Sequence, residues 1–472
     1  MLQRILTNLA PDEVGALWIG LLVTLLVFGE FGRLWSRQNA SLAALLLVAP
    51  LLTKLLALKG QPWAFATLYL ITAFYVFWGL ALALGWRAGP WRLGVRESSL
   101  RPLLVGLLLL NAVMVFGNPP DDAGFFSNIS ALRWRETGKL PYGDPQFLDP
   151  ATPTWHSAGT YGPLLVAAHV PFQWLLGAPE NPAEMDPRSP SYRRPPLLAS
   201  QLACFAFHLV GLFALFRIVE PLSGRLRALA VVVVYAGSPY IIGLGGGALK
   251  ITGLTFISHI APSAAVLAAF LFLERPFLAG VLLGAATGIL YYPAFLFCAW
   301  AGWLIARRRS ALNFTVGFAL AGILIAGLVA ACSHAPDVSG AARAFVASTV
   351  EHQEGTAAGS YGAGDFSFWG THPSLAAFWN RPLFGSTSLF KPTFLIYVMF
   401  SLGAFFLARN RGKAQLAALT ASLAAAAQLW RTHAPGTYVE WFYPFLLIAL
   451  FAGESDRDST GAPEVSGESP NL

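Results

Sequence analysis

Long apolar runs alternate with short polar segments along the whole chain. A helix needs about 20 apolar residues to cross the roughly 30 Å hydrocarbon core of a bilayer. The run 277–306 is too long for one ordinary span and contains Tyr291-Tyr292-Pro293, so we expect two short helices there. The pattern predicts an all-α, polytopic transmembrane bundle of about 13 spans. The remaining candidate spans are 14–32, 40–58, 63–85, 102–117, 197–219, 228–247, 253–273, 311–332, 393–409, 413–430 and 438–453.

Composition supports a membrane solvent, because only 12% of the residues are charged and 56% are apolar. Soluble domains carry about 25% charged residues, so this chain cannot cover a core of its size with water-facing groups. Three cysteines are too few for a disulfide-stapled secreted fold. The net charge of +7 does not form one patch of the kind that binds nucleic acid.

The basic residues instead mark loops between the apolar runs, as expected for loops held on the cytoplasmic side. If the loop 87–101 is cytoplasmic, 217–227, 307–309 and 409–413 are cytoplasmic too, provided that 164–176 does not span. Two long outer segments then remain, 118–196 and 333–392, and both are rich in aromatic residues. Aromatic side chains favour the headgroup level of a bilayer. We therefore expect membrane-surface helices in these loops and a site at the outer face.

The most informative stretch begins the first outer segment and reads Asn118-Pro119-Pro120-Asp121-Asp122-Ala123-Gly124-Phe125-Phe126. Pro-Pro ends one helix and can open the next. Apolar residues then recur with the spacing of an amphipathic helix lying on the membrane over about 121–138. An aspartate there has two readings that the sequence leaves open: it caps the helix, where acids favourably meet the dipole, or it acts as a base.

Further along, Gly138-Lys139-Leu140-Pro141-Tyr142 and Tyr161-Gly162-Pro163-Leu164 follow. With the Asp121-Asp122 pair and Phe125, this order resembles the first outer loop of the GT-C superfamily of membrane glycosyltransferases over about 60 residues. The resemblance implies a GT-C-like core at 101–453, an N-terminal addition at 1–100 and an acidic flexible tail at 454–472. The chain departs from that pattern because three helices precede the acidic loop and because Phe125 stands where tyrosine is usual.

The resemblance also implies a reaction: transfer of a sugar from polyprenyl phosphate to a hydroxyl of a glycan, lipid or protein. Asp121 would be the base, and Asp122 the alternate base or a metal ligand. Direct displacement by one carboxylate inverts the anomeric centre. Tyr142 and Tyr161 would contact substrate at the outer face of the cytoplasmic (inner) membrane. No nucleic acid is expected, and a divalent cation is the only cofactor that the sequence leaves open.

The leaving phosphate needs positive charge or hydrogen-bond donors. Glu351-His352-Gln353-Glu354 lacks a standard zinc spacing, and loop-end residues such as Arg381 and Lys391 equally suit anchoring at the headgroups. The candidates in the second outer segment and beside the last helix are His352, His372, Arg381, Lys391, Arg431 and His433.

Ionisable residues within the apolar runs are a further source of candidates. Glu440 lies just inside the outer interface, where we expect it to contact a sugar hydroxyl, whereas His259 suits a hydrogen-bonded packing role. Two rival functions remain. Pro-interrupted helices also suit a secondary transporter, although no repeat of two similar halves is present. A non-catalytic envelope-assembly protein would make the paired aspartates incidental.

Overall fold

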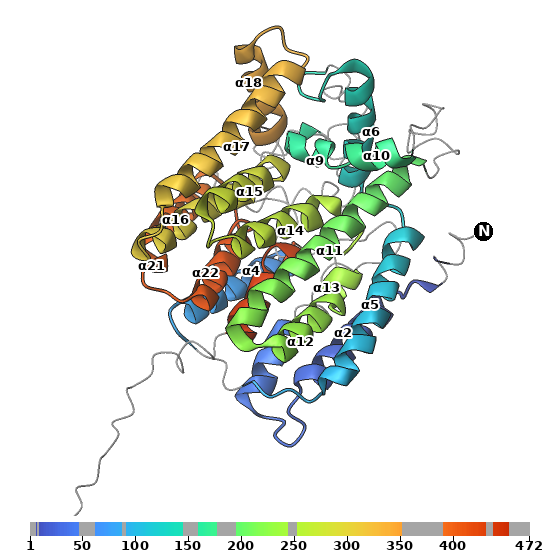
Figure 1. Ribbon diagram of the computed structural model, residues 1–472, viewed down its shortest axis with the longest axis vertical. Coiled ribbons are helices and arrows are strands. Elements are labelled where there is room, and N and C mark those ends of the chain that lie inside the picture. The colour runs from blue at the N-terminus through green and yellow to red at the C-terminus, as the bar shows by residue number, and fades with distance from the viewer. Residues whose placement is uncertain are drawn as a thin grey trace, which may run out of the picture.

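The computed structural model describes residue 6 and residues 9–46, 62–86, 91–144, 159–176, 195–243, 253–351, 390–430 and 438–452. Every regular element in these ranges is helical, and none of them contains a strand. The helices pack into one elongated bundle (Figure 1). The structure therefore confirms the all-α class predicted from the apolar pattern.

Within the described residues, three helices are long and apolar enough to cross a membrane: Glu97–Gly117, Leu198–Ser223 and Ala311–Cys332. They belong to α5 (Glu97–Gly117), α11 (Pro195–Ser223) and α17 (Ala311–Cys332). The other main helices of the bundle are α2 (Glu13–Phe28), α4 (Pro62–Ala83), α12 (Arg225–Ala236), α14 (Ile257–Leu271), α15 (Pro276–Ile289), α16 (Phe297–Ala306), α21 (Phe390–Ala408), α22 (Lys413–Ala426) and α23 (Tyr443–Phe451).

Two of the predicted apolar runs are interrupted. The run 277–306 divides into α15, η4 (Tyr292–Leu296) and α16, which confirms the expected break at Tyr291-Tyr292-Pro293. The run 228–247, expected as one span, instead divides after α12, because Pro239 opens the separate turn α13 (Pro239–Ile242). The Ser238 hydroxyl caps that turn by accepting the Tyr240 N–H over 3.2 Å.

Glycines at intervals of four let α15 pack closely on α17. A Cβ on Gly280 would lie 2.1 Å from the Phe314 carbonyl oxygen, and one on Gly284 would lie 2.6 Å from the Ala321 Cβ. Small residues spaced in this way allow backbones to approach where lipid removes the hydrophobic drive between helices. The third glycine, Gly288, contacts a different segment. A Cβ on Gly162 would lie 2.1 Å from the Gly288 carbonyl oxygen, so the segment that leads into residue 163 also packs closely on α15.

The N-terminal helices share the core of the rest of the chain. The Phe28 and Phe451 rings stack with centroids 4.0 Å apart, joining α2 to the last helix. Ser422 of α22 donates a hydrogen bond to the Val76 carbonyl of α4 over 2.7 Å. One buried apolar cluster runs from α2 to α23. The described helices within residues 1–100 are therefore packed into the bundle rather than attached beside it.

Several basic loops meet one another through side chains. Arg225 lies 3.6 Å from the Glu97 carboxylate, and Arg227 donates to the Trp91 carbonyl over 3.2 Å. Elsewhere Arg307 donates to the Arg411 carbonyl. The helices α6 (Asp122–Thr137), α9 (Pro163–Ala167) and α10 (Val170–Leu176) lie near α18 (Val338–Val346), at the upper end of Figure 1. The π-turn η5 (Ala347–Glu351) follows α18.

The helix expected on the membrane surface over 121–138 is present as α6, but its setting differs from the prediction. Residues 123–132 are all buried, polar ones included. The Gln173 amide of α10 donates to the backbone and side-chain oxygens of Asn128, each over 2.7 Å. α6 therefore packs inside the protein between α9, α10, α11 and α14. Gly138, in the left-handed conformation with φ 71°, ends it.

Candidate functional site

Asp121 stands at the start of α6 and uses both carboxylate oxygens. Oδ1 accepts the Gly124 N–H over 3.0 Å as a helix cap, and Oδ2 accepts the Ser258 hydroxyl over 3.2 Å. Its own N–H donates to the Thr255 carbonyl over 3.1 Å. The capping role expected from the sequence is thus real, and Asp121 is also fastened to the segment that opens α14.

Aspartates cap two other helices in the same way, and these caps can be compared with Asp121 to show which contacts a helix cap needs. Asp12 accepts the Gly15 N–H over 2.7 Å, and Asp337 accepts the Gly340 N–H over 2.6 Å. Both side chains are exposed, and neither has a second side-chain partner in the described parts of the chain. Asp121 is half-buried and holds a hydroxyl on its second oxygen. It therefore has an environment that capping does not explain.

Gly124 permits this approach. A Cβ at that position would lie 2.8 Å from Asp121 Oδ1, 3.0 Å from the Ile257 side chain and 3.1 Å from the Ser200 hydroxyl. Ser200 in turn contacts His169, whose Nε2 lies 3.2 Å away and whose Nδ1 lies 2.9 Å from the Leu165 carbonyl. Burial lowers the pKa of His169 to about 4, since the charged imidazolium is disfavoured without water. Ser200 thus lies between the first turn of α6 and a neutral histidine.

Glu440 reaches the same segment from the other end of the chain. It lies in η6 (Val439–Trp441) and is fully buried. Oε1 accepts the Gly253 N–H over 2.7 Å, and the Glu440 carbonyl accepts the Ser263 hydroxyl over 2.7 Å. Oε2 has no hydrogen-bond partner among the described residues. Gly253 has φ +116°, a conformation that side chains other than glycine rarely adopt.

The segment 253–259 therefore joins the two acidic residues. Its first N–H is held by Glu440, while Thr255 and Ser258 hold Asp121. The sequence separates these carboxyl groups by more than 300 residues, and the fold places them on one short stretch of backbone. This pair and the segment between them form the candidate site.

Aromatic rings line one side of this segment. Trp441 stacks between Tyr292, with centroids 4.4 Å apart, and Tyr438, with centroids 4.6 Å apart. Tyr438 also stacks on His259 at 4.4 Å, and the Trp441 indole N–H donates to His259 Nδ1 over 3.1 Å. A cavity of about 20 Å³, the size of one water, adjoins Tyr292 and Trp441. His259 thus has the hydrogen-bonded packing role expected for it.

Tyr142 and Tyr161, the two tyrosines assigned to substrate, lie against each other. The Tyr142 hydroxyl donates to the Tyr161 carbonyl over 2.7 Å, and its ring meets Phe345 edge-on at 5.1 Å. Tyr142 is fully buried, and burial raises the pKa of its phenol. Tyr161 is half-buried and precedes the Gly162 N–H that bonds to the Ile289 carbonyl over 3.0 Å. Tyr142 therefore uses its hydroxyl to hold the first outer loop together.

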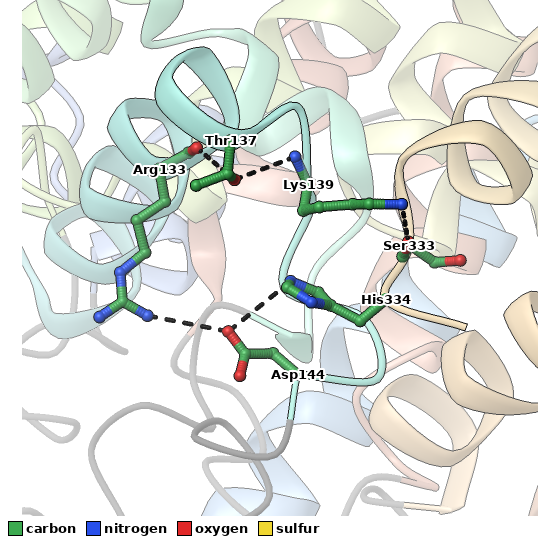
Figure 2. Close-up of polar contacts among 6 residues, drawn as sticks. All are labelled: Arg133, Thr137, Lys139, Asp144, Ser333 and His334. Carbon is green, nitrogen blue, oxygen red and sulfur yellow. Dashed lines mark hydrogen bonds and ion pairs between the residues drawn. The ribbon is translucent and has the colours of Figure 1, made fainter. Parts of the chain in front are cut away.

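A polar cluster closes the far end of α6 (Figure 2). Lys139 Nζ donates to the Ser333 carbonyl over 2.9 Å, while Arg133 and His334 lie 3.8 and 3.7 Å from one oxygen of Asp144. Arg133, the nearest member of the cluster along α6, follows Asp121 by 12 residues, and at 1.5 Å per residue this is about 18 Å of helix. The cluster ties the first outer loop to the end of α17 and is too distant to act at Asp121.

The side chains of the other predicted site residues are not among those that the structure describes. Asp122 and Lys391 lie in the described helices α6 and α21, but their side chains are not described. The described residues contain no group of three or more metal-ligating side chains, and metal binding by Asp122 stays a prediction. The predicted phosphate-binding residues outside the described ranges are His352, His372, Arg381, Arg431 and His433.

Sequence reasoning missed Gly253, Thr255 and Ser258. They lie in a run that reads as continuous apolar helix, and a serine there suggests helix packing more readily than a partner for a distant aspartate. The one signal available was the pair Ser258-His259, two polar residues together at the start of that run. No protein-family model, no curated protein and no solved structure matches this chain.

Proposed function

We propose that the chain is an integral-membrane glycosyltransferase that moves a sugar from polyprenyl phosphate to an acceptor hydroxyl. The proposal includes a GT-C-like bundle of about 13 spans in the cytoplasmic membrane, with the reaction at its outer face. The acceptor belongs to the envelope and is a glycan, a lipid or a protein. The single observation that carries the proposal is the setting of Asp121, whose second oxygen is held by Ser258 beyond any need of the helix cap.

The chemistry needs one carboxylate, which matches what the site offers. The acceptor oxygen attacks the anomeric carbon as its proton passes to Asp121, and the bond from that carbon to the phosphate oxygen breaks. The lipid phosphate leaves as a stable anion, so no general acid is needed on that side. Such a single displacement inverts the anomeric centre.

The motif order of the first outer loop supports the same reading. Asp121 opens α6, Tyr142 closes on Tyr161, and Gly162 leads into α9. These contacts make one connected unit of the residues that resemble the superfamily's loop. Glu440 supports it from the other side, because its Oε2, which has no hydrogen-bond partner among the described residues, is an acceptor for a hydroxyl of the substrate.

The experiment is a transfer assay with the purified full-length chain. A panel of polyprenyl-phosphate sugars, including mannose, glucose and arabinose donors, is offered with envelope extracts, and products are identified by mass spectrometry. Covalent transfer of one sugar with inverted anomeric configuration is expected. Uptake of labelled sugar into proteoliposomes without covalent transfer would instead establish a transporter. An unchanged envelope after loss of the protein's Asp121 and Asp122 carboxylates would favour a non-catalytic assembly role.

A further inference from the structure

The turn that follows α2 is fixed by one asparagine. The Asn39 Nδ2 group donates to the carbonyls of Glu30, Arg33 and Leu34 over 2.9, 3.1 and 3.2 Å. Its Oδ1 accepts the Glu30 N–H over 2.9 Å. Because one side chain makes four hydrogen bonds to its backbone, the turn formed by residues 30–34 has a fixed conformation. The directions of its side chains are therefore fixed as well.

A buried glutamine places a second loop beside this turn. Gln38 is 4% exposed and donates to the carbonyls of Phe28 and Arg92, the latter over 2.9 Å. Its Oε1 accepts the Arg92 N–H, also over 2.9 Å. Trp91, next in the loop, packs edge-on to Phe28 at 5.9 Å. The two loops are therefore held together by the core, and Arg92 lies beside the turn.

The loops enclose a basic hollow of about 520 Å³. Arg33, Arg37 and Arg92 line it, with Glu30 as the one acidic residue. None of the three arginines has an ion-pair partner in the described parts of the chain, and all three are exposed. The hollow thus offers three guanidinium groups against one carboxylate, which suits an anion such as phosphate.

An apolar groove of about 670 Å³ continues from the hollow and shares its wall residues Leu34, Trp35 and Ser36. Trp35 is 100% exposed and Leu34 is 71% exposed. Large apolar side chains left outside the fold in this way mark a contact with an apolar partner. The rest of the groove lies between residues 37–46 and α4, and is lined by Ala40, Ala43, Ala44, Leu70, Ile71 and Phe74.

We propose that the hollow and groove together bind one anionic phospholipid, with its phosphate at Arg33, Arg37 and Arg92 and an acyl chain in the groove. The combination of a basic hollow and an adjoining apolar groove indicates the class of ligand. It complements an anionic amphiphile, which has a charged group joined to an apolar chain. A polar solute leaves the groove uncovered, and a neutral lipid leaves the arginines unmatched. Basic pockets between membrane helices bind phospholipid headgroups in this way, each cation contributing about fivefold to affinity.

The test is a native mass-spectrometry titration of the delipidated full-length protein with phosphatidylglycerol and with phosphatidylcholine of the same acyl chains. Wild type is expected to retain phosphatidylglycerol preferentially. The combined substitution R33Q/R37Q/R92Q should lower that affinity about a hundredfold, whereas Glu30→Gln should raise it about fivefold. The matched control removes three exposed arginines that do not line the hollow and have no ion-pair partner among the described residues: Arg275, Arg308 and Arg409.

Two further measurements separate the outcomes. Ala43→Trp fills the exposed groove without changing charge, and should weaken phosphatidylglycerol binding while leaving the melting temperature unchanged. Equal retention of both lipids would overturn the proposal, as would an equal loss in the control triple variant. A groove occupied by a second polypeptide would leave Glu30→Gln without effect on lipid binding, which also contradicts it. Glu30→Gln is expected to raise the affinity for phosphatidylglycerol, and a misfolded variant would not show such an increase.

Discussion

Replacing Glu440 by leucine tests whether the two acidic residues act as one structural unit. The leucine keeps a similar volume but removes the acceptor of the Gly253 N–H, a bond of 2.7 Å in a fully buried setting. A buried donor left without a partner costs about 1–3 kcal/mol. We expect the segment 253–259 to move away from η6 so that the Gly253 N–H is no longer buried without a partner. Because Thr255 and Ser258 are hydrogen-bonded to Asp121, Asp121 should move with the segment.

The effect on activity follows from the same geometry. A misplacement of about 1 Å at a catalytic group can lower the rate about a hundredfold. We therefore expect Glu440→Leu to lower the melting temperature in detergent and to reduce kcat about tenfold to a hundredfold. Glu440→Gln retains an oxygen for Gly253, so its stability should stay within about 1 kcal/mol of wild type. Thermal unfolding and steady-state transfer kinetics measure the two quantities.

Two results would refute this reasoning. Glu440→Leu with wild-type kcat and melting temperature would show that the segment does not depend on Glu440. Glu440→Gln as damaging as Glu440→Leu would show that the acidic group itself, rather than its acceptor oxygen, is what the site needs. The second result would show that Glu440 acts mainly through its contact with substrate rather than by positioning the segment 253–259.

Three other predictions concern the surroundings of the site. Ser258→Ala should lower kcat/KM about tenfold to a hundredfold, since a hydrogen bond to a charged group contributes about 1.5–3 kcal/mol; an unchanged value would deny its role at Asp121. His169 is neutral when folded because its pKa is lowered to about 4 from 6.5, so it contributes up to about 3 kcal/mol. That stability is present above pH 6.5 and is lost as pH falls toward 4, and His169→Gln should flatten this part of the melting-temperature profile. Gly162→Ala should cost about 1–3 kcal/mol by overpacking, whereas Gly322→Ala, with open space around it, should not lower the melting temperature.

Helix class and helix breaks were predictable because they depend on local chemistry. A proline fixes its own φ angle and has no backbone N–H to donate. Pro293 therefore predicted a break in the helix, and the structure contains that break. Pro239 carried the same information, and the expected single span across it was wrong. The helix cap at Asp121 was also predictable, because it requires only an aspartate whose side chain accepts the backbone N–H three residues later.

The setting of α6 was less predictable, because amphipathic spacing does not say what the apolar face meets. Phe125 and Ile129 suit a lipid surface as well as a protein interior. Asn128 decides between them, since its oxygens are used by Gln173 of α10, which no local pattern encodes. The link from Asp121 to Ser258 likewise depends on contacts across more than 100 residues.

Transfer by an Asp121→Asn variant tests the central claim most directly. Asparagine can still cap α6 through its side-chain oxygen, but it cannot accept the acceptor's proton. Asp337→Asn is the matched control, because Asp337 caps α18 in the same way and its second oxygen has no hydroxyl partner among the described residues. With the polyprenyl-phosphate sugar identified by the donor panel, Asp121→Asn should lose transfer by at least about a hundredfold, while Asp337→Asn should keep it. Near-normal transfer by Asp121→Asn would contradict the account.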